Sequence, residues 1–396
     1  MTTAVGAEVE GAARRPPRWT LVRLLGEQTH PVVILAVMLG EGLDRVVILG
    51  TQAVEGRAAH AKAAINRLEP EAEVEFVEPL PPYDWRSVRR KVGEILRRYD
   101  HPILDLTGGT KLMMLGAYLA GKARGAPMVY VETGTKTVQV LDGVAEGLVA
   151  RGWPDIGLEA LLLARGFRVE AKKAECLPKE YLAVCNTIVD RPHVWWEWLR
   201  LLAKRPADRG TVTLSLAGKT GKKARRLAFP EILMKHGLAT MDGANPLPLF
   251  RDSETQRTFT GGHWLERYVA AAALEAGVGE VWVNGLCTKL ESADAGVLDN
   301  GGPDHEFDVA LVRGTTLHLV SCKSGRKDAK SVDILTNDVR QLGGSFGRGA
   351  LVSLNPVSEQ MAARARDNGL AVWHGGDLGR ERLAELIGKW VGVDER

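Results

Sequence analysis

Cysteines are few in this chain, and their spacing excludes the sites that they most often build. The 396 residues include Cys176, Cys185, Cys287 and Cys322 and no other cysteine. No two are spaced as C-x-x-C, and no quartet of Cys and His has the spacing of a zinc site. A disulfide framework is not expected in a chain of this length, so we expect the reducing environment of the cytoplasm.

Long apolar runs are also missing. The longest, residues 31–39, is too short to cross a bilayer. The first residues, MTTAVGAEVEGAARRPPRW, lack the apolar stretch of a signal peptide. We expect residues 1–15 to form a disordered tail, and we predict no contact with a membrane.

An excess of charge of either sign is missing too. The net charge of +3 permits a nucleic-acid partner without arguing for one. Apolar residues make up 45% of the chain and charged residues 26%, which is typical of a soluble globular protein. The length exceeds that of one ordinary core and predicts two or three domains.

The first domain, residues 16–150, alternates between strand and helix patterns and predicts a Rossmann-like α/β fold. Such alternation is typical of a mainly parallel sheet that helices cover on both faces. Strands are expected at 19–25, 45–49, 74–77, 102–106, 128–132 and 138–141, and helices at 32–40, 54–68, 85–99 and 111–124.

The next region, residues 151–258, has a weaker pattern and is either winged-helix-like or a linker. Helical stretches are expected at 158–166, 179–190 and 194–204, with a strand at 211–216. Its basic run either contacts phosphates or is a solvated loop. The run contains Lys219, Lys222, Lys223, Arg225 and Arg226.

The last domain, residues 259–396, predicts a small α/β layout built around a hairpin at 307–323. A helix and a strand precede the hairpin, at 263–276 and 280–284. The hairpin is followed by helices at 328–342, 358–368 and 377–391 and by strands at 350–354 and 371–374.

A glycine-rich turn, Thr107-Gly108-Gly109-Thr110-Lys111, connects a strand of the first domain to the next helix. Glycines let the backbone turn tightly and approach a ligand closely. The N–H groups at the helix start, two hydroxyls and one lysine then suit a phosphate. The turn therefore predicts an anion site, and the alternative is a tight turn without a ligand. It matches neither the dinucleotide fingerprint nor a P-loop.

Further residues of the first domain are expected at the same edge of the sheet, because they also follow strands. These are Gly26, Glu27, Gln28 and Thr51.

The hairpin FDVALVRGTTLHLVSCKSG, residues 307–325, carries a second group of polar residues. A type II′ turn at Gly314-Thr315 would place Asp308 opposite Ser321 and Glu306 opposite Lys323, with all four side chains on one face. Carboxylates suit Mg or Mn, which promote phosphodiester hydrolysis by activating water. The alternative is a surface salt bridge between the lysine and one of the acids.

The order of elements in residues 20–145 resembles the CARF domains of CRISPR ancillary nucleases. The resemblance rests on a strand followed by GEQ-x-x-P, a strand ending at Thr51, and D-x-T-G-G-T-K before a Met-rich helix. It implies a homodimer that binds a cyclic oligoadenylate, most simply cyclic tetra-adenylate, across a two-fold interface. The implied contacts are Thr107, Gly108, Gly109, Thr110 and Lys111, with Gly26, Glu27, Gln28 and Thr51 around the ligand.

Residues 260–355 are similar to the PD-(D/E)xK restriction-like nucleases that are fused to CARF domains. A helix with W-L-E, then E-F-D and x-C-K, carries this resemblance. It implies that Glu266, Asp308 and Lys323 are catalytic, and that Glu266, Asp308 and the Cys322 carbonyl bind Mg or Mn. Ser321 stands where the pattern has an acid, so Glu306 is the candidate that replaces it. Gln341, on the next helix, either holds the substrate or is a surface residue.

Together the resemblances imply a metal-dependent endonuclease of type III CRISPR antiviral defence, activated by cyclic oligoadenylate, that cuts DNA, RNA or both. The alternative is a CARF sensor whose nuclease-like domain binds nucleic acid without cutting it, and Ser321 favours that alternative.

Overall fold

The structure is a computed structural model of the chain. It describes residues 18–143, 152–206, 212–216, 228–241, 248–290, 302–325 and 330–393. The expected tail at 1–15, the basic run at 219–226 and most of the loop before the hairpin lie outside these ranges. The chain forms two compact units, Met1–Trp153 and Pro154–Arg396.

Within its described residues, the N-terminal unit has six strands and four α-helices, close to the predicted positions. The strands are β1 (Trp19–Leu24), β2 (Leu43–Leu49), β3 (Glu73–Phe76), β4 (Pro102–Asp105), β5 (Met128–Glu132) and β6 (Thr137–Asp142). The helices are α1 (His30–Leu39), α2 (Glu55–Leu68), α3 (Trp85–Arg98) and α4 (Lys111–Arg124), with short turns η1 (Gly40–Gly42) and η2 (Gln52–Val54).

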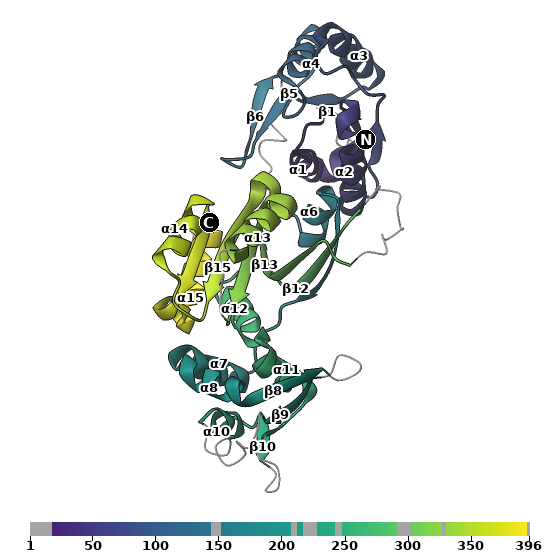
Figure 1. The fold of residues 1–396 in the computed structure, drawn as a ribbon. Coiled ribbons are helices and arrows are strands. Elements are labelled where there is room, and N and C mark those ends of the chain that lie inside the picture. Colours follow the sequence, from purple (N-terminus) through teal and green to yellow (C-terminus); the bar gives the residue numbers. More distant parts are fainter. Residues whose placement is uncertain are drawn as a thin grey trace, which may run out of the picture. The chain divides into compact units, whose positions relative to one another are not determined.

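These strands form one sheet in the order β3-β2-β1-β4-β5-β6. All neighbours are parallel except β6, which runs antiparallel to β5. Figure 1 shows α3 and α4 on one side of the sheet and α1 and α2 on the other. Apolar side chains of β1, β2 and β4 pack against α3 and α4 to form a buried cluster. The Rossmann-like fold predicted from the sequence is confirmed.

A buried ion pair crosses the centre of this sheet. Arg23 of β1 lies opposite Asp105 of β4 in the parallel register. Their side chains form a salt bridge and are 1% and 0% exposed. Burial lowers the pKa of Arg23, and the charge of Asp105 opposes that shift. Each charge is therefore held in the core by the other, at the end of the sheet where the predicted ligand loops begin.

The C-terminal unit contains the predicted hairpin and a larger set of elements around it. The strands are β7 (Phe167–Lys173), β8 (Leu202–Pro206), β9 (Val212–Leu216), β10 (Ala239–Met241), β11 (Pro248–Phe250), β12 (Glu280–Lys289), β13 (His305–Arg313), β14 (Thr316–Lys323), β15 (Gly347–Ser353) and β16 (Leu370–His374). The helices are α6 (Leu158–Ala164), α7 (Lys179–Asp190), α8 (Pro192–Leu201), α10 (Ala228–Lys235), α11 (Ser253–Gly261), α12 (His263–Glu275), α13 (Lys330–Asp338), α14 (Glu359–Asp367) and α15 (Arg380–Val391). Three short helical turns complete the unit: η3 (Val339–Gly343), η4 (Gly344–Phe346) and η5 (Gly375–Leu378).

The main sheet of this unit has the order β16-β15-β14-β13-β12-β7. The three pairs from β7 to β14 are antiparallel, and the pairs β14–β15 and β15–β16 are parallel. The edge strand β7 comes from the region that the sequence assigned to a linker or a winged helix. The first part of residues 151–258 therefore belongs to the sheet, while the winged-helix expectation for the rest stays a prediction.

Helix α8 is shorter than predicted. It ends at Leu201 instead of residue 204, because Leu202–Pro206 pairs with Val212–Leu216 as an antiparallel ribbon. Two of its tryptophans pack in the core, and Trp196 packs against them. Trp195 and Trp198 are each 1% exposed, and the Trp195 indole N–H donates to the Phe259 carbonyl at 2.9 Å.

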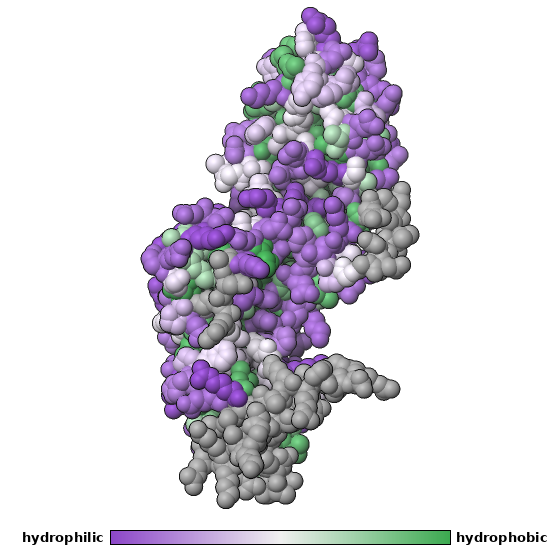
Figure 2. Space-filling view, in the orientation of Figure 1, coloured by the Kyte–Doolittle hydropathy of each residue, from purple (hydrophilic) through white to green (hydrophobic). Residues whose placement is uncertain are grey.

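The surface of the described residues is mostly hydrophilic in the view of Figure 2. No helix within the described ranges is both long and apolar enough to span a membrane.

The buried pair Arg23–Asp105 gives a stability test. The Asp105→Ala change should lower the free energy of unfolding of the N-terminal unit by about 3–5 kcal/mol, because it leaves the Arg23 charge buried without a partner. The paired change Arg23→Met with Asp105→Leu should cost much less, since it removes both charges together. Denaturant unfolding followed by circular dichroism measures both. Equal losses in the single and the paired variant would contradict this account.

Candidate functional site

The predicted ligand residues of the N-terminal unit lie at one edge of its sheet. Gly26 to Gln28 follow β1, Thr51 follows β2, and Thr107 to Lys111 follow β4. Because the sheet order is β2-β1-β4 with parallel strands, the three loops are neighbours at the carboxyl ends. The structure thus brings together the residues that the sequence grouped, at the place where open α/β sheets bind ligands.

Two of these loops touch through their glycines. A Cβ atom at Gly108 would overlap the carbonyl oxygen of Leu24 and lie 2.8 Å from the amide nitrogen of Gly26. Gly109 has a φ of +80°, a conformation that L side chains rarely adopt. The glycines are therefore required by the packing of the β4 loop on the β1 loop.

The two threonine hydroxyls of the turn hold the loop in place, whereas the sequence assigned them to a phosphate. Thr107 Oγ1 donates to Asp105 and accepts the Val131 N–H at 2.8 Å. Thr110 Oγ1 donates to the Pro82 carbonyl at 2.5 Å and accepts the Met113 N–H at 3.2 Å, which caps α4. Within the turn this leaves Lys111 and the backbone N–H groups after Thr107 as the groups suited to an anion, because the Thr107 N–H donates to Asp105.

Asp105 connects this loop to the buried ion pair. Its Oδ1 accepts the Thr107 N–H at 2.8 Å, while its Oδ2 pairs with Arg23. Nearby, the Gln28 Oε1 atom is buried and has no hydrogen-bond partner among the described residues. A buried acceptor without a partner is costly in a folded protein, so this carboxamide is a candidate ligand contact.

The hairpin of the C-terminal unit has the predicted register. Gly314 has a φ of +61°, as the first position of a type II′ turn requires. The two strands pair from Arg313 opposite Thr316 to Val309 opposite Val320. This register places Asp308 next to Ser321, and the Ser321 hydroxyl donates to Asp308 Oδ2 at 3.2 Å.

Asp308 holds the end of β14 through three consecutive residues. Besides the Ser321 hydroxyl, its Oδ2 accepts the Cys322 backbone N–H at 2.6 Å and the Lys323 ammonium at 3.4 Å. The Asp308 and Lys323 side chains are 28% and 33% exposed. The acid and the lysine therefore face a small cavity of about 170 Å³ that Glu306 also lines.

Glu266 lies on the first turn of α12 and is hydrogen-bonded to His263, with a distance of 3.2 Å between the carboxylate and Nδ1. Its side chain is 14% exposed. Burial raises the pKa of the Cys322 thiol well above its usual value, and the charges of Asp308 and Glu266 add to the shift. The two carboxylates thus raise the pKa of the same thiol, that of Cys322.

A further acid, Asp338, lines the same small cavity as Asp308, Ser321 and Lys323. It ends α13, and its Oδ1 lies 2.8 Å from the His305 Nδ1. Burial raises the pKa of Asp338, and the hydrogen bond with His305 opposes the shift. The sequence did not single this residue out, because no motif distinguishes it from other acids on predicted helices.

The weaker sequence candidate, Gln341, does not line this cavity. It is exposed in η3, and its backbone carbonyl accepts a hydrogen bond from Arg165 at 3.1 Å. Asp304, just before β13, accepts the Lys289 N–H at 2.7 Å.

Oxygen ligands are present for a divalent ion, but they are few. Asp308 and Glu266 supply carboxylates, and the resemblance implies the Cys322 carbonyl as a third oxygen ligand. Such hard ligands fit Mg or Mn. In the part of the chain that the structure describes, no three His, Cys, Asp or Glu side chains form a group suited to a metal. The donors present thus fit a site with two carboxylates.

Comparison with known proteins identifies a domain in the C-terminal unit and relatives of the overall fold. Residues 252–392 match the family model of the Card1-like endonuclease domain. No curated protein sequence matches the chain significantly.

Solved structures share the fold over almost the whole chain. Protein VC1899 from Vibrio cholerae superposes with a TM-score of 0.73 at 17% identity, covering 95% of this chain and 98% of that one. Can2 from Sulfobacillus thermosulfidooxidans, in complex with cyclic tetra-adenylate, gives 0.66 at 18% identity, covering 94% and 96%.

A type III CRISPR defence DNA nuclease activated by cyclic oligoadenylate gives a TM-score of 0.52 at 23% identity. This chain is covered to 89% and spans about half of that longer one, 47%. Residues 252–392 therefore match an endonuclease domain, in a chain that shares its whole fold with VC1899 and Can2.

Proposed function

We propose that this protein is an endonuclease of type III CRISPR antiviral defence that cyclic oligoadenylate activates and that requires Mg or Mn. The endonuclease-domain match over residues 252–392 supports the reaction class. Two structures with the same fold support the activator: one is a complex with cyclic tetra-adenylate, and the other is a nuclease activated by cyclic oligoadenylate. The substrate is DNA, RNA or both.

The observation that carries the proposal is the grouping of Asp308 and Lys323 at the end of the hairpin. The Lys323 ammonium lies 3.4 Å from Asp308 and faces the shared cavity, where it would offset charge on a phosphate or orient the attacking water. Asp308, Glu266 and the Cys322 carbonyl would hold the divalent ion. When bound, that ion supplies activation of water and compensation of negative charge.

The missing acid at Ser321 has two candidate replacements. Glu306 was the expectation from the register, and it is exposed at the mouth of the cavity. Asp338 is the second, since it lines the same cavity from α13 and is held by His305. Both lie on the side of the sheet that Asp308 faces.

The cyclic oligoadenylate would bind where the β1, β2 and β4 loops meet. The contacts proposed are Gly26, Glu27, Gln28, Thr51 and the turn Thr107–Lys111. Backbone N–H groups at the start of α4 and the Lys111 ammonium suit the phosphates of the ring. For activation to follow, the ligand must bind one arrangement of the two nuclease domains better than another.

A homodimer would complete that ligand site, and an apolar face on α4 supports it. Leu112, Met114, Leu115 and Tyr118 are 36–42% exposed on this helix. They lie at helical spacing directly after the turn that begins the helix. A second copy of the chain packed on this face would bring its own turn to the same ligand.

The second candidate function is a sensor whose nuclease-like domain binds nucleic acid without cutting it. Ser321, which hydrogen-bonds to Asp308 in place of a third acid, favours this alternative. A cleavage assay separates the two. Plasmid DNA, single-stranded DNA and RNA are incubated with Mg or Mn, with and without cyclic tetra-adenylate, and absence of cleavage in every combination would reject the endonuclease.

The Lys323→Ala variant should lower the cleavage rate by about 10²–10⁴-fold, the range that a group acting on the transferring proton or charge contributes. Binding of cyclic tetra-adenylate, measured by calorimetry, should not change, because Lys323 lies in the other unit. Lys389→Ala, on the exposed face of α15, serves as the control for loss of one lysine. Full activity of Lys323→Ala would remove it from the mechanism.

The Gly108→Ala variant should weaken binding of cyclic tetra-adenylate at least about tenfold, which corresponds to about 1.4 kcal/mol. The added Cβ would overlap the Leu24 carbonyl and push the β4 loop away from the β1 loop. Gly56→Ala, where a Cβ meets nothing within 4 Å, is the matched control and should bind normally. Unchanged affinity of Gly108→Ala would show that the turn does not shape the ligand site.

The apolar face of α4 is tested by Leu115→Glu combined with Tyr118→Glu. These changes should convert a dimer into a monomer in light scattering, because two carboxylates in each copy would be buried at the interface. The control, Leu249→Glu, alters a side chain that is 65% exposed on β11 and should stay dimeric. A dimer that survives the double change uses another surface.

A further inference from the structure

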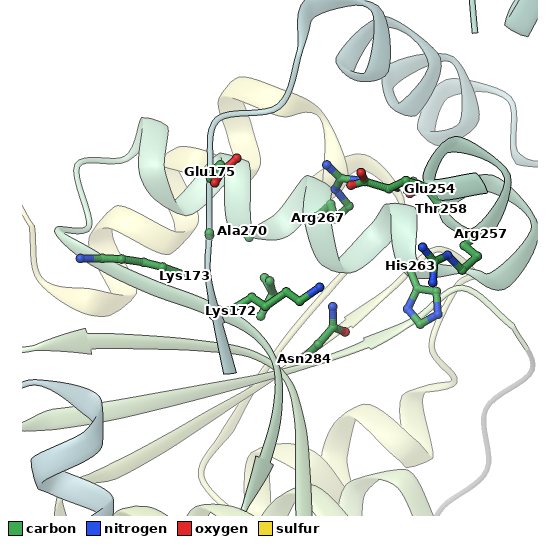
Figure 3. A pocket seen from close by; sticks show the side chains of 12 residues that line it. Lys172, Lys173, Glu175, Glu254, Arg257, Thr258, His263, Arg267, Ala270 and Asn284 are labelled. Carbon is green, nitrogen blue, oxygen red and sulfur yellow. Dashed lines mark hydrogen bonds and ion pairs between the residues drawn. The ribbon is translucent and has the colours of Figure 1, made fainter. Parts of the chain in front are cut away.

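A second cavity of the C-terminal unit is lined by His263, whose ring is hydrogen-bonded to Glu266 of the proposed site. It has a volume of about 660 Å³ and is bounded by β7 and β12 of the sheet and by α11 and α12. Figure 3 shows Lys172, Asn284, His263 and Arg257 around one end of it. These four residues come from four different elements or their junctions, and no sequence motif connects them.

The cations on opposite walls of this cavity are available to a ligand. Lys172 of β7 and Arg257 of α11 are exposed, and neither forms an ion pair with another described residue. The cavity also contains Arg267, which is already engaged: Glu254 pairs with it at 2.8 Å and the Thr258 hydroxyl lies at 3.2 Å. Glu175, an exposed acid, lines the cavity as well.

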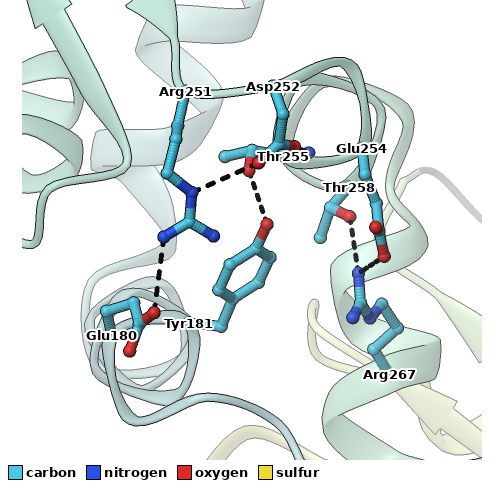
Figure 4. A network of polar contacts seen from close by, with 8 residues as sticks. All are labelled: Glu180, Tyr181, Arg251, Asp252, Glu254, Thr255, Thr258 and Arg267. Carbon is cyan, nitrogen blue, oxygen red and sulfur yellow. Dashed lines mark hydrogen bonds and ion pairs between the residues drawn. The ribbon is translucent and has the colours of Figure 1, made fainter.

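A network of polar contacts keeps this engaged arginine in place. Figure 4 shows the Arg267 side chain between Glu254 and Thr258. Its guanidinium also lies over the Tyr181 ring, 5.2 Å from the centroid. The Tyr181 hydroxyl is 2.5 Å from the Thr255 hydroxyl, which fixes the start of α11 to α7. These contacts join α11, which carries Arg257, to α7 and α12.

Asn284 occupies a strained position at the floor of the cavity. Its φ is +53°, which is unusual for any residue other than glycine. It sits where the pairing of β12 with β7 shifts register, between Val283 and Leu286. A bulge of this kind re-aims a side chain, and strain of this kind often accompanies a binding function.

The bulge is fixed to the strand that carries Asp308. Gly285 pairs with Phe307 of β13, and a Cβ at Gly285 would overlap the Phe307 ring. The Phe307 ring thus packs directly on the bulge, and Phe307 precedes Asp308 in the chain. Asn284 therefore has a defined position relative to the proposed catalytic acid.

His263 connects the cavity to the same acids. It lines the cavity, and its Nδ1 contacts Glu266. Hydrogen bonding to Glu266 raises the pKa of His263, and the charge of Asp308 adds to the shift. The ring is thus a direct connection between the cavity and Glu266.

We propose that this cavity holds the sugar–phosphate backbone of the substrate strand next to the phosphate that is cut. Lys172 and Arg257 contact two phosphates from opposite walls, and the Asn284 carboxamide hydrogen-bonds to the nucleotide between them. Asn284 is then a positioning residue. This inference rests on the proposed nuclease function. It adds that the nucleic-acid strand reaches the catalytic residues from the cavity between β7, β12, α11 and α12.

The phosphate contacts are tested by the salt dependence of binding. Full-length protein with cyclic tetra-adenylate and EDTA is titrated into fluorescein-labelled single-stranded DNA, and separately RNA, and anisotropy gives the affinity. Loss of two phosphate contacts in Lys172→Ala with Arg257→Ala should reduce the log–log salt slope by about 1.4. The penalty should therefore be about sevenfold larger at 50 mM than at 200 mM salt. Arg382→Ala with Lys389→Ala, on α15, removes the same charge away from the cavity and should leave the slope unchanged.

The role of Asn284 is tested by Asn284→Gly, because glycine accepts the positive φ and only the carboxamide is lost. The variant should unfold at the same or a higher denaturant concentration than the wild type. It should cleave its substrate at least tenfold more slowly and raise KM more than it lowers kcat. Unchanged kcat and KM would show that the Asn284 carboxamide does not position the substrate.

The possible outcomes separate a failure of this inference from a failure of the proposed nuclease function. A wild type that neither binds nor cuts either strand rejects the endonuclease itself. A wild type that binds and cuts, with cavity variants that behave like the α15 control, rejects the cavity alone. Preferential binding of a labelled acidic peptide over both nucleic acids would also overturn the proposal.

Discussion

The carboxylate of Asp308 is the constraint on which the C-terminal site depends. One oxygen atom accepts hydrogen bonds from three consecutive residues of β14, including the backbone N–H of Cys322. The described backbone pairing of the two strands ends at Val309 and Val320, one position before these contacts. Beyond that point the Asp308 side chain, and not backbone pairing, connects the two strands and sets the position of Lys323. On its other side β14 stays paired to β15, up to Lys323 opposite Ser353.

The N-terminal unit uses a similar arrangement at the end of a strand. Asp105 is the last residue of β4, and its two oxygens have separate partners. One accepts the Thr107 N–H and organises the turn, and the other pairs with Arg23 in the core. In both units a carboxylate on a strand thus fixes a neighbouring segment: Asp105 positions the turn that follows β4, and Asp308 positions the end of β14. The difference is exposure, since Asp105 is buried and Asp308 remains open to the cavity.

Much of the fold could be predicted because strong local patterns agree with the tertiary structure. The predicted bounds are correct for the helix Lys111–Arg124 and for the strand Met128–Glu132. The helix is bounded by a glycine-rich turn before it and by Gly125 after it. The register of the hairpin was also predictable, because Gly314 specifies the turn. Local agreement of this kind is typical of sequences that fold to one structure.

The remaining features depend on partners that are distant in the sequence. Strand β7, FRVEAKK, consists mostly of charged residues, and most of its side chains are exposed or half-buried. Its sequence pattern therefore resembles a solvated segment more than a strand of a sheet. Asp338 reaches the cavity through the packing of α13, and the threonine hydroxyls of the turn find partners at Pro82 and Val131. Such contacts cannot be predicted from the spacing of residues in the sequence, because they form only when distant segments pack together.

The origin of β7 has a consequence for how this protein can be divided. Residues 252–392, which match the endonuclease-domain model, contain five strands of the main sheet and lack the sixth. A fragment with these ends would leave β12 as an open edge, with the backbone groups around Leu286 to Lys289 free to pair with other chains. Such a fragment would be prone to aggregation. The smallest piece in which β7 covers β12 begins before Phe167, so the sheet extends well ahead of the residues that match the family model.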